Sequence, residues 1–252
     1  MPATPAWPPK SLPRLHVEQV LAQDNSVPLG AGPANYLGNV LRLEPGAEVK
    51  LFDGATGEWL ARIDEIGRKR AVLTVVAHLR PPEAVPDLWL LFAPLKRGRI
   101  DWLVEKATEL GAARLVPVLT RRTVVDRLNL GRLRAHAIEA AEQCERTVVP
   151  ELAEPVKLDR LLAAWPAERT LYFADETGGA PLARIATAGP AAILIGPEGG
   201  FTDEERAAIQ ALPQARGVSL GPRILRAETA ALAAIALWMA SAGDWSDPSP
   251  PR

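Results

Sequence analysis

The chain has 252 residues, of which 48% are hydrophobic and 23% charged, and its formal net charge is −1 at pH 7. This length can bury one large core or two modest ones, and the near-neutral charge excludes a broadly basic surface that would bind any nucleic acid. No apolar run reaches the roughly 18 residues of a membrane span, and the proline-rich start lacks a signal-peptide core, so we expect a cytoplasmic protein without membrane attachment. The single Cys144 and three scattered histidines offer no disulfide framework and no zinc spacing, so no metal is expected.

Short β-type segments separated by turns follow a proline-rich start, residues 1–13, that we expect to be disordered. The segments alternate or are rich in β-forming residues, and they lie at 40–43, 48–52, 58–63 and 71–76. Glycine turns between them include one that fits a hairpin loop. This pattern predicts a small β-barrel over 14–80, followed by a proline-rich linker over 81–87.

Strand and helix patterns alternate over 88–244, which indicates an α/β domain with a largely parallel sheet. Strands are predicted at 89–93, 114–119, 170–174, 192–195 and 217–220. Amphipathic spacing predicts helices over 100–110 and 133–144, and an alanine-rich run predicts a core or subunit-packing helix over 230–240. Cys144 lies on the apolar side of the second helix, so packing is its expected role. Residues 245–252 are expected to be disordered.

The most informative segment is 191–205, where a buried-strand pattern leads into a glycine turn and then a helix start. The glycines within 196–200 allow a sharp turn and close approach to a ligand. Thr202 followed by Glu205 is a capping box. Acidic residues here, Glu198 among them, disfavour a phosphate and favour a ligand that is neutral or cationic.

A second junction of the same kind covers 219–230. Its turn carries Arg223 and Arg226, and a new helix starts near Glu228. Because parallel strands end at one edge of a sheet, the two loops can form a single pocket there. Apolar side chains of this loop offer packing surface for an adenine ring, namely Leu220, Ile224 and Leu225.

These two motifs carry a family resemblance. Residues 194–200, Leu-Ile-Gly-Pro-Glu-Gly-Gly, together with 220–230, Leu-Gly-Pro-Arg-Ile-Leu-Arg-Ala-Glu-Thr-Ala, resemble the signature of the SPOUT class of RNA methyltransferases. More narrowly, the chain is similar to the RsmE family of 16S ribosomal RNA uridine-N3 methyltransferases. The N-terminal match is weaker, since Asn35-Tyr36 replaces the family's usual histidine ahead of residues 40–42.

The resemblance implies an α/β SPOUT domain with a deep trefoil knot, a small N-terminal PUA-like β-barrel that binds RNA, and a homodimer. The knot would bind S-adenosylmethionine through Ala174, Leu194, Ile195, Gly196, Pro197, Gly199, Gly200, Leu220, Gly221, Ile224, Leu225 and Arg226. The implied partner is 16S rRNA or the small ribosomal subunit. The expected RNA contacts are Arg14 and four cations of the local basic clusters, Lys96, Arg99, Arg121 and Arg122.

Methylation at uracil N3 makes specific demands on the site. The sulfonium already activates the methyl group, so its transfer needs positioning, but N3 carries a proton whose loss requires a base or a stabilised anion. Arg223 and Arg226 suit stabilisation of the anion or a phosphate clamp. Glu198 and Glu228 are both candidate proton acceptors, and the sequence does not choose between them.

Two other classes of function are weaker. A non-catalytic RNA-binding or ribosome-assembly factor on the same scaffold would have no need for both loops and their arginines. A dinucleotide oxidoreductase is disfavoured because residues 196–200 lack G-x-G-x-x-G spacing.

Overall fold

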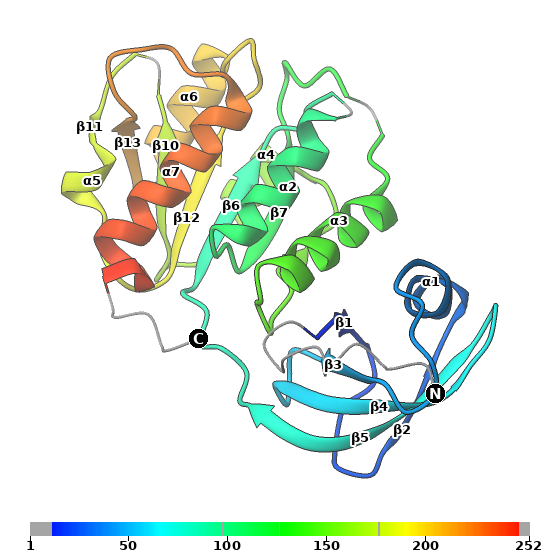
Figure 1. Ribbon diagram of the computed structural model, residues 1–252. Coiled ribbons are helices and arrows are strands. Elements are labelled where there is room, and N and C mark those ends of the chain that lie inside the picture. The colour runs from blue at the N-terminus through cyan, green and yellow to red at the C-terminus, as the bar shows by residue number, and fades with distance from the viewer. Residues whose placement is uncertain (1–11, 97, 126, 176, 247–252) are drawn as a thin grey trace. The chain divides into compact units, whose positions relative to one another are not determined.

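The computed structural model describes residues 12–246 except 97, 126 and 176. It divides into two compact units (Figure 1). Of the described residues, those up to Ala84 together with Ala141–Val148 form one unit, and Val85–Ala140 together with those after Val148 form the other. Most of the two tails predicted to be disordered falls outside the described residues, although Trp245 and Ser246 complete a 3₁₀ helix, η3 (Asp244–Ser246). No described helix has both the length and the apolarity to span a bilayer.

The N-terminal unit is built on one sheet of five strands in the order β1-β3-β4-β5-β2. Their bounds are β1 (Arg14–His16), β3 (Glu48–Phe52), β4 (Glu58–Ile66), β5 (Ala71–Arg80) and β2 (Ser26–Leu29). Among the described strands of this sheet, only β1 with β3 is a parallel pair. Alternate residues of the strands form the core, because successive side chains point to opposite faces. Val49, Leu51, Ile63 and Leu73 are fully buried in it.

The predicted strand at 40–43 is wrong. The chain instead forms α1 (Ala31–Asn35), a π-helical turn, η2 (Tyr36–Val40), and then Arg42 in the left-handed region with φ of 56°. The apolar spacing that matters is helical, since Ala34 and Leu37 are buried and Leu41 packs on the same core. Val40, which contributed to the apparent strand pattern, is 62% exposed.

The C-terminal unit contains a parallel sheet, as predicted, in the order β11-β13-β10-β12-β6-β7-β8, with β9 also pairing with β7. The strands are β6 (Leu88–Phe92), β7 (Arg114–Leu119), β8 (Glu151–Leu152), β9 (Val156–Lys157), β10 (Thr170–Ala174), β11 (Ala180–Pro181), β12 (Ala191–Ile195) and β13 (Ala215–Ser219). The helices are α2 (Arg99–Glu109), α3 (Leu130–Gln143), α4 (Leu158–Ala163), α5 (Leu182–Ile185), α6 (Asp203–Gln210) and α7 (Ala227–Ala242), with α3 from Ala141 on grouped with the N-terminal unit. The α/β class and all five predicted strands of this domain are confirmed.

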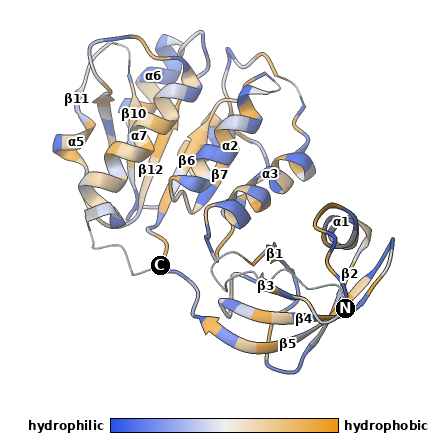
Figure 2. Ribbon diagram, viewed as in Figure 1, coloured by the Kyte–Doolittle hydropathy of each residue, from blue (hydrophilic) through white to orange (hydrophobic). Residues whose placement is uncertain are grey.

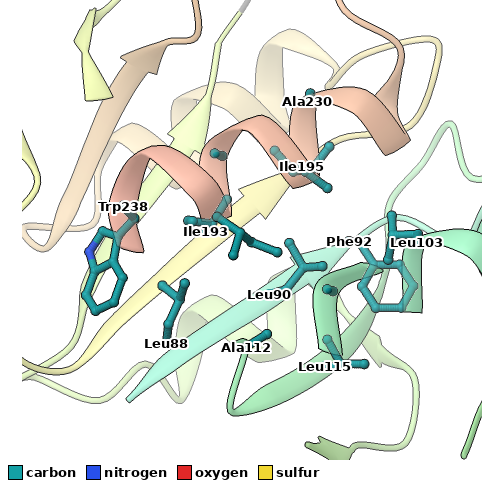
Figure 3. Packing of buried hydrophobic residues seen from close by; sticks show 14 of the residues in the cluster. Leu88, Leu90, Phe92, Leu103, Ala112, Leu115, Ile193, Ile195, Ala230 and Trp238 are labelled. Atoms are coloured by element: carbon teal, nitrogen blue, oxygen red, sulfur yellow. The ribbon is translucent and has the colours of Figure 1, made fainter. Parts of the chain in front are cut away.

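Both faces of this sheet are buried, which explains its continuous apolar strands. Leu90 and Phe92 of β6 point into a cluster with α2 and α7 that includes Trp238 (Figure 3). Leu91, between them, points into the opposite cluster with Phe201 and residues of α4 and α6. Coloured by hydropathy, the central strands form an apolar layer (Figure 2). Because helices cover both faces of the sheet, a ligand site is expected at the ends of the strands.

Cys144 does not have its predicted packing role. It follows the last residue of α3 and is exposed. The helical periodicity that placed it on the apolar side stops one residue earlier, at Gln143.

Candidate active site

A cavity of about 440 Å³ lies at the carboxyl ends of the adjacent strands β10, β12 and β13. Three loops line it: the one after β10, the one from β12 to α6, and the one from β13 to α7. Ligands collect at such an edge in open parallel sheets because the loops there meet. The two glycine-rich loops are therefore brought together as the sequence predicted.

The loop from β12 to α6 is a tight turn closed by a helix cap. Gly200 has φ of 69° and donates its N–H to the Pro197 carbonyl at 2.9 Å. The capping box is present, since Thr202 Oγ1 accepts from the Glu205 N–H and Glu205 Oε2 accepts from the Thr202 N–H. At Gly196 a Cβ would lie 3.1 Å from the buried Phe201 ring. A side chain at this position would press on the ring that shapes one cavity wall.

The loop from β13 to α7 is open to solvent on its outer side. Gly221 has φ of 117°, a region that L side chains rarely adopt, so glycine is needed for this turn. Ile224 is 93% exposed, an unusual position for a large apolar side chain. Arg223 is exposed beside it, and exposed Arg226 is the N-cap residue of α7. The loop thus presents apolar and cationic groups at the mouth of the cavity.

The third lining segment contains an ion pair that the sequence predictions missed. Asp175, directly after β10, pairs with Arg206 of α6, and both line the cavity. Burial would raise the pKa of Asp175, but hydrogen bonds from the Thr177 N–H and hydroxyl and from Arg206 outweigh burial and hold that pKa below 3.8. Asp175 could have been found as the polar residue that ends a buried strand, whereas nothing in the sequence marks Arg206.

Arg99 connects the two candidate proton acceptors. Its Nη1 lies 3.2 Å from Oε1 of Glu198, and its Nε lies 3.7 Å from Oε1 of Glu228. Glu198 lines the cavity and is nearly half exposed, but Glu228 is 9% exposed and does not line it. Among the described residues, Oε2 of Glu228 has no hydrogen-bond partner.

The cavity contains most of the residues predicted for the site. The predicted residues that line it are Ala174, Ile195, Gly196, Pro197, Glu198, Gly200, Leu220, Gly221, Arg223, Ile224, Leu225 and Arg226. Leu194 does not, because it points into the core on the opposite face of the sheet. Gly199 does not either, since it faces the Arg122 side chain and its carbonyl accepts from that guanidinium. Lining residues that the predictions missed include Gly178, Phe201, Ser219 and Pro222.

The predicted RNA-contacting cations divide into two groups. Lys96, Arg121 and Arg122 have exposed positions in the C-terminal unit, and Arg99 is partly exposed. The prediction that Arg14 contacts RNA is wrong, because the residue is 8% exposed and its guanidinium binds partners inside the N-terminal unit. It pairs with Glu58 and donates to the carbonyls of Ala141, Glu142 and Arg146. These bonds also explain why Ala141–Val148 groups with this unit.

Known proteins match the chain along most of its length. The model of the RNA methyltransferase domain matches residues 81–239, and that of the RNA methyltransferase PUA domain matches residues 34–76. With a parallel sheet and a cavity at its carboxyl edge, these matches place the chain among the RNA methyltransferases.

The particular family follows from whole-chain relatives. Ribosomal RNA small subunit methyltransferase E of Rickettsia conorii is 31% identical, with 88% of this chain and 93% of that protein covered. The Synechocystis protein of the same name is 32% identical over 87% and 74%. This chain belongs to the ribosomal RNA small subunit methyltransferase E family, as the sequence motifs predicted.

Solved structures agree. A ribosomal RNA small subunit methyltransferase E from Neisseria gonorrhoeae, bound to S-adenosyl methionine, has a TM-score of 0.84 at 30% identity and covers 91% of this chain and 97% of its own. A putative methyltransferase from Legionella pneumophila, in complex with the same cofactor, has a TM-score of 0.86 at 28% identity, with 92% and 98% covered.

Proposed function

We propose that this protein transfers the methyl group of S-adenosylmethionine to N3 of a uridine in the 16S rRNA of the small ribosomal subunit. The observation that carries the proposal is the cavity between the two glycine-rich loops, in a chain whose relatives are named as small-subunit rRNA methyltransferases. Two structural neighbours contain S-adenosylmethionine, which supports that cofactor.

The residues of the cavity fit this cofactor. The volume of the cavity is within the usual range for small-molecule sites, about 300–1,000 Å³. Leu220 and Leu225 offer apolar surface for an adenine ring, and the carboxylates of Asp175 and Glu198 suit a ligand that carries positive charge. The cofactor supplies an electrophilic methyl group, so the protein's task is to place uracil N3 in line with it.

The chain's own residues supply the remaining chemistry in this proposal. Arg223 and Arg226 stabilise the negative charge that develops on the uracil oxygens as the N3 proton leaves, or hold a neighbouring phosphate. Glu198 accepts that proton, directly or through water, because it lines the cavity and retains solvent access. Glu228 is buried outside the cavity lining, so we assign it to positioning through Arg99 instead.

The proposed function also includes a knotted domain, a homodimer and residues that bind RNA. We propose a deep trefoil knot in the C-terminal domain and a cytoplasmic homodimer, for which the half-buried Leu232, Ala233, Ala236 and Leu237 of α7 offer an apolar face. The PUA-like domain and the cations Lys96, Arg121 and Arg122 would hold RNA.

The decisive experiment is incubation of the purified protein with S-adenosylmethionine and unmethylated small subunits, followed by mass spectrometry of the nucleosides. We expect 3-methyluridine at one position. Cofactor binding by calorimetry without any methyl transfer to naked or assembled rRNA would contradict the proposal. Absence of cofactor binding would favour a non-catalytic RNA-binding factor on this scaffold.

A further inference from the structure

The β4–β5 hairpin of the N-terminal unit carries three consecutive cations at its tip. The two strands pair as far as Ile66 and Ala71, and the Gly67 N–H donates to the Arg70 carbonyl at 2.8 Å. The turn between them contains Arg68, Lys69 and Arg70, all exposed. In a protein whose net charge is −1, this turn is a local concentration of positive charge.

These cations are not neutralised by the fold. Among the described residues, none of the three forms an ion pair. By contrast, Glu58 forms ion pairs with Arg14, Lys50 and Arg80. Besides Glu58, β4 carries two carboxylates closer to the tip, Asp64 and Glu65. One of them, Asp64, accepts from the Thr74 hydroxyl at 2.6 Å. The tip therefore keeps an excess of positive charge, and salt confines its field to within about 10 Å, so a partner must touch it.

The strand residues that flank the turn are anchored in the core of the N-terminal unit. Ala71 is fully buried in the core, and Ile66 packs against the same core. Ile66 also lies against Gly38 of η2: a Cβ added at Gly38 would be 3.2 Å from Cδ1 of Ile66. The hairpin and α1 are neighbours in this unit (Figure 1). A fixed base lowers the entropy cost of binding through the tip.

We propose that Arg68, Lys69 and Arg70 bind phosphates of the RNA substrate's backbone. This inference rests on the proposed function and adds a contact surface to it. An RNA occupant is favoured because the matched RNA methyltransferase PUA domain, residues 34–76, contains the whole turn. Lysine and arginine neutralise phosphates without reading base identity, so the tip adds affinity and leaves the choice of nucleotide to the cavity.

The test compares full-length wild type with the triple variant Arg68→Ala, Lys69→Ala, Arg70→Ala on transcribed small-subunit rRNA. Binding is measured from 50 to 200 mM salt. Loss of three phosphate contacts reduces the slope of log affinity against log salt by about 2 to 3, and we expect affinity near 150 mM to fall about tenfold. The KM for RNA should rise while kcat at saturation is kept. The charge-conserving pair Arg68→Lys, Arg70→Lys should behave as wild type.

The matched control removes three exposed arginines of the C-terminal unit, Arg160, Arg184 and Arg216, by alanine substitution. An equal loss in this control would assign the effect to net charge and overturn the inference. An unchanged salt slope in the hairpin variant, together with an active wild type, would also overturn the inference. That outcome would leave the proposed function intact. A binding defect seen only with vesicles of anionic lipid, and not with rRNA, would also overturn the inference. Should the triple variant not fold, Lys69→Ala alone should reduce the slope by about 1.

Discussion

The Nε atom of Arg99, at the start of α2, lies 3.7 Å from Oε1 of Glu228, at the start of α7. The same guanidinium also reaches Glu198 in the first glycine-rich loop. Because Glu228 is buried, its charge is costly without a partner. Arg99 therefore links the two helix starts to the cavity wall.

Replacing Arg99 by Met should destabilise the protein by about 1–2 kcal/mol, less than for a fully buried pair because Arg99 is partly exposed. Adding Glu228→Gln should recover part of that loss, since the buried charge is removed. Urea unfolding of wild type, both single variants and the double variant measures the coupling. Strictly additive losses would show that the two side chains do not interact.

Replacing Arg226 by Ala should lower kcat for methyl transfer by about 100-fold or more, as expected for loss of a group that stabilises developing charge. The free energy of unfolding should change by less than about 1 kcal/mol, because Arg226 is exposed and its side chain makes no capping bond. Arg184→Ala, an exposed arginine of the same unit, is the control. Parallel losses of activity and melting temperature would argue for a structural role instead.

The proton acceptor can be identified by comparing Glu198→Gln with Glu228→Gln. We expect Glu198→Gln to lower kcat by about 100-fold, as for loss of the group that accepts the N3 proton. Glu228→Gln should lower kcat much less, because Glu228 does not line the cavity. The reverse pattern would reassign the base to Glu228.

Two glycines of the first loop should respond differently to alanine. Gly196→Ala should weaken cofactor affinity about tenfold or more, since its Cβ would lie 3.1 Å from the Phe201 ring at the cavity wall. Gly199→Ala should leave affinity within about twofold, since its Cβ would be in ordinary contact with the Arg122 side chain, away from the cavity. Calorimetry with S-adenosylmethionine measures both. Similar losses in both variants would place Gly199 in the site after all.

The N-terminal unit should lose stability in acid through Glu58. Burial would raise the pKa of Glu58, but hydrogen bonds and charge from Arg80 and Arg14 outweigh burial and lower that pKa below 4.5. Its stabilising contribution is thus present above the unfolded-state pKa and disappears as the pH falls through the folded-state value. Glu58→Gln should cost about 2 kcal/mol at pH 7, and its stability should approach that of wild type as the pH falls through the lowered folded-state pKa of Glu58. Exposed Glu65→Gln, on the same strand, is the control for removal of one negative charge from this unit.

Local patterns were sufficient where each element has a strong signal of its own. The apolar runs of β7 and β10 and the capping box at Thr202 need no distant partner to be recognised. The strand expected at 40–43 failed because three apolar residues fit two periods equally well, and burial of Leu37 against the sheet selects the helical one.

The sequence by itself determined the α/β class, the two glycine-rich loops and the family, since backbone turns, caps and buried strands are encoded by neighbouring residues. Only the tertiary structure decided which side chains meet. It placed Arg206 beside Asp175 and Arg99 between two carboxylates, turned Arg14 into an internal cation and moved Gly199 away from the cavity. Such contacts depend on which strands are neighbours in the sheet and on how the helices pack across it, and neither can be read from residues close together in the chain.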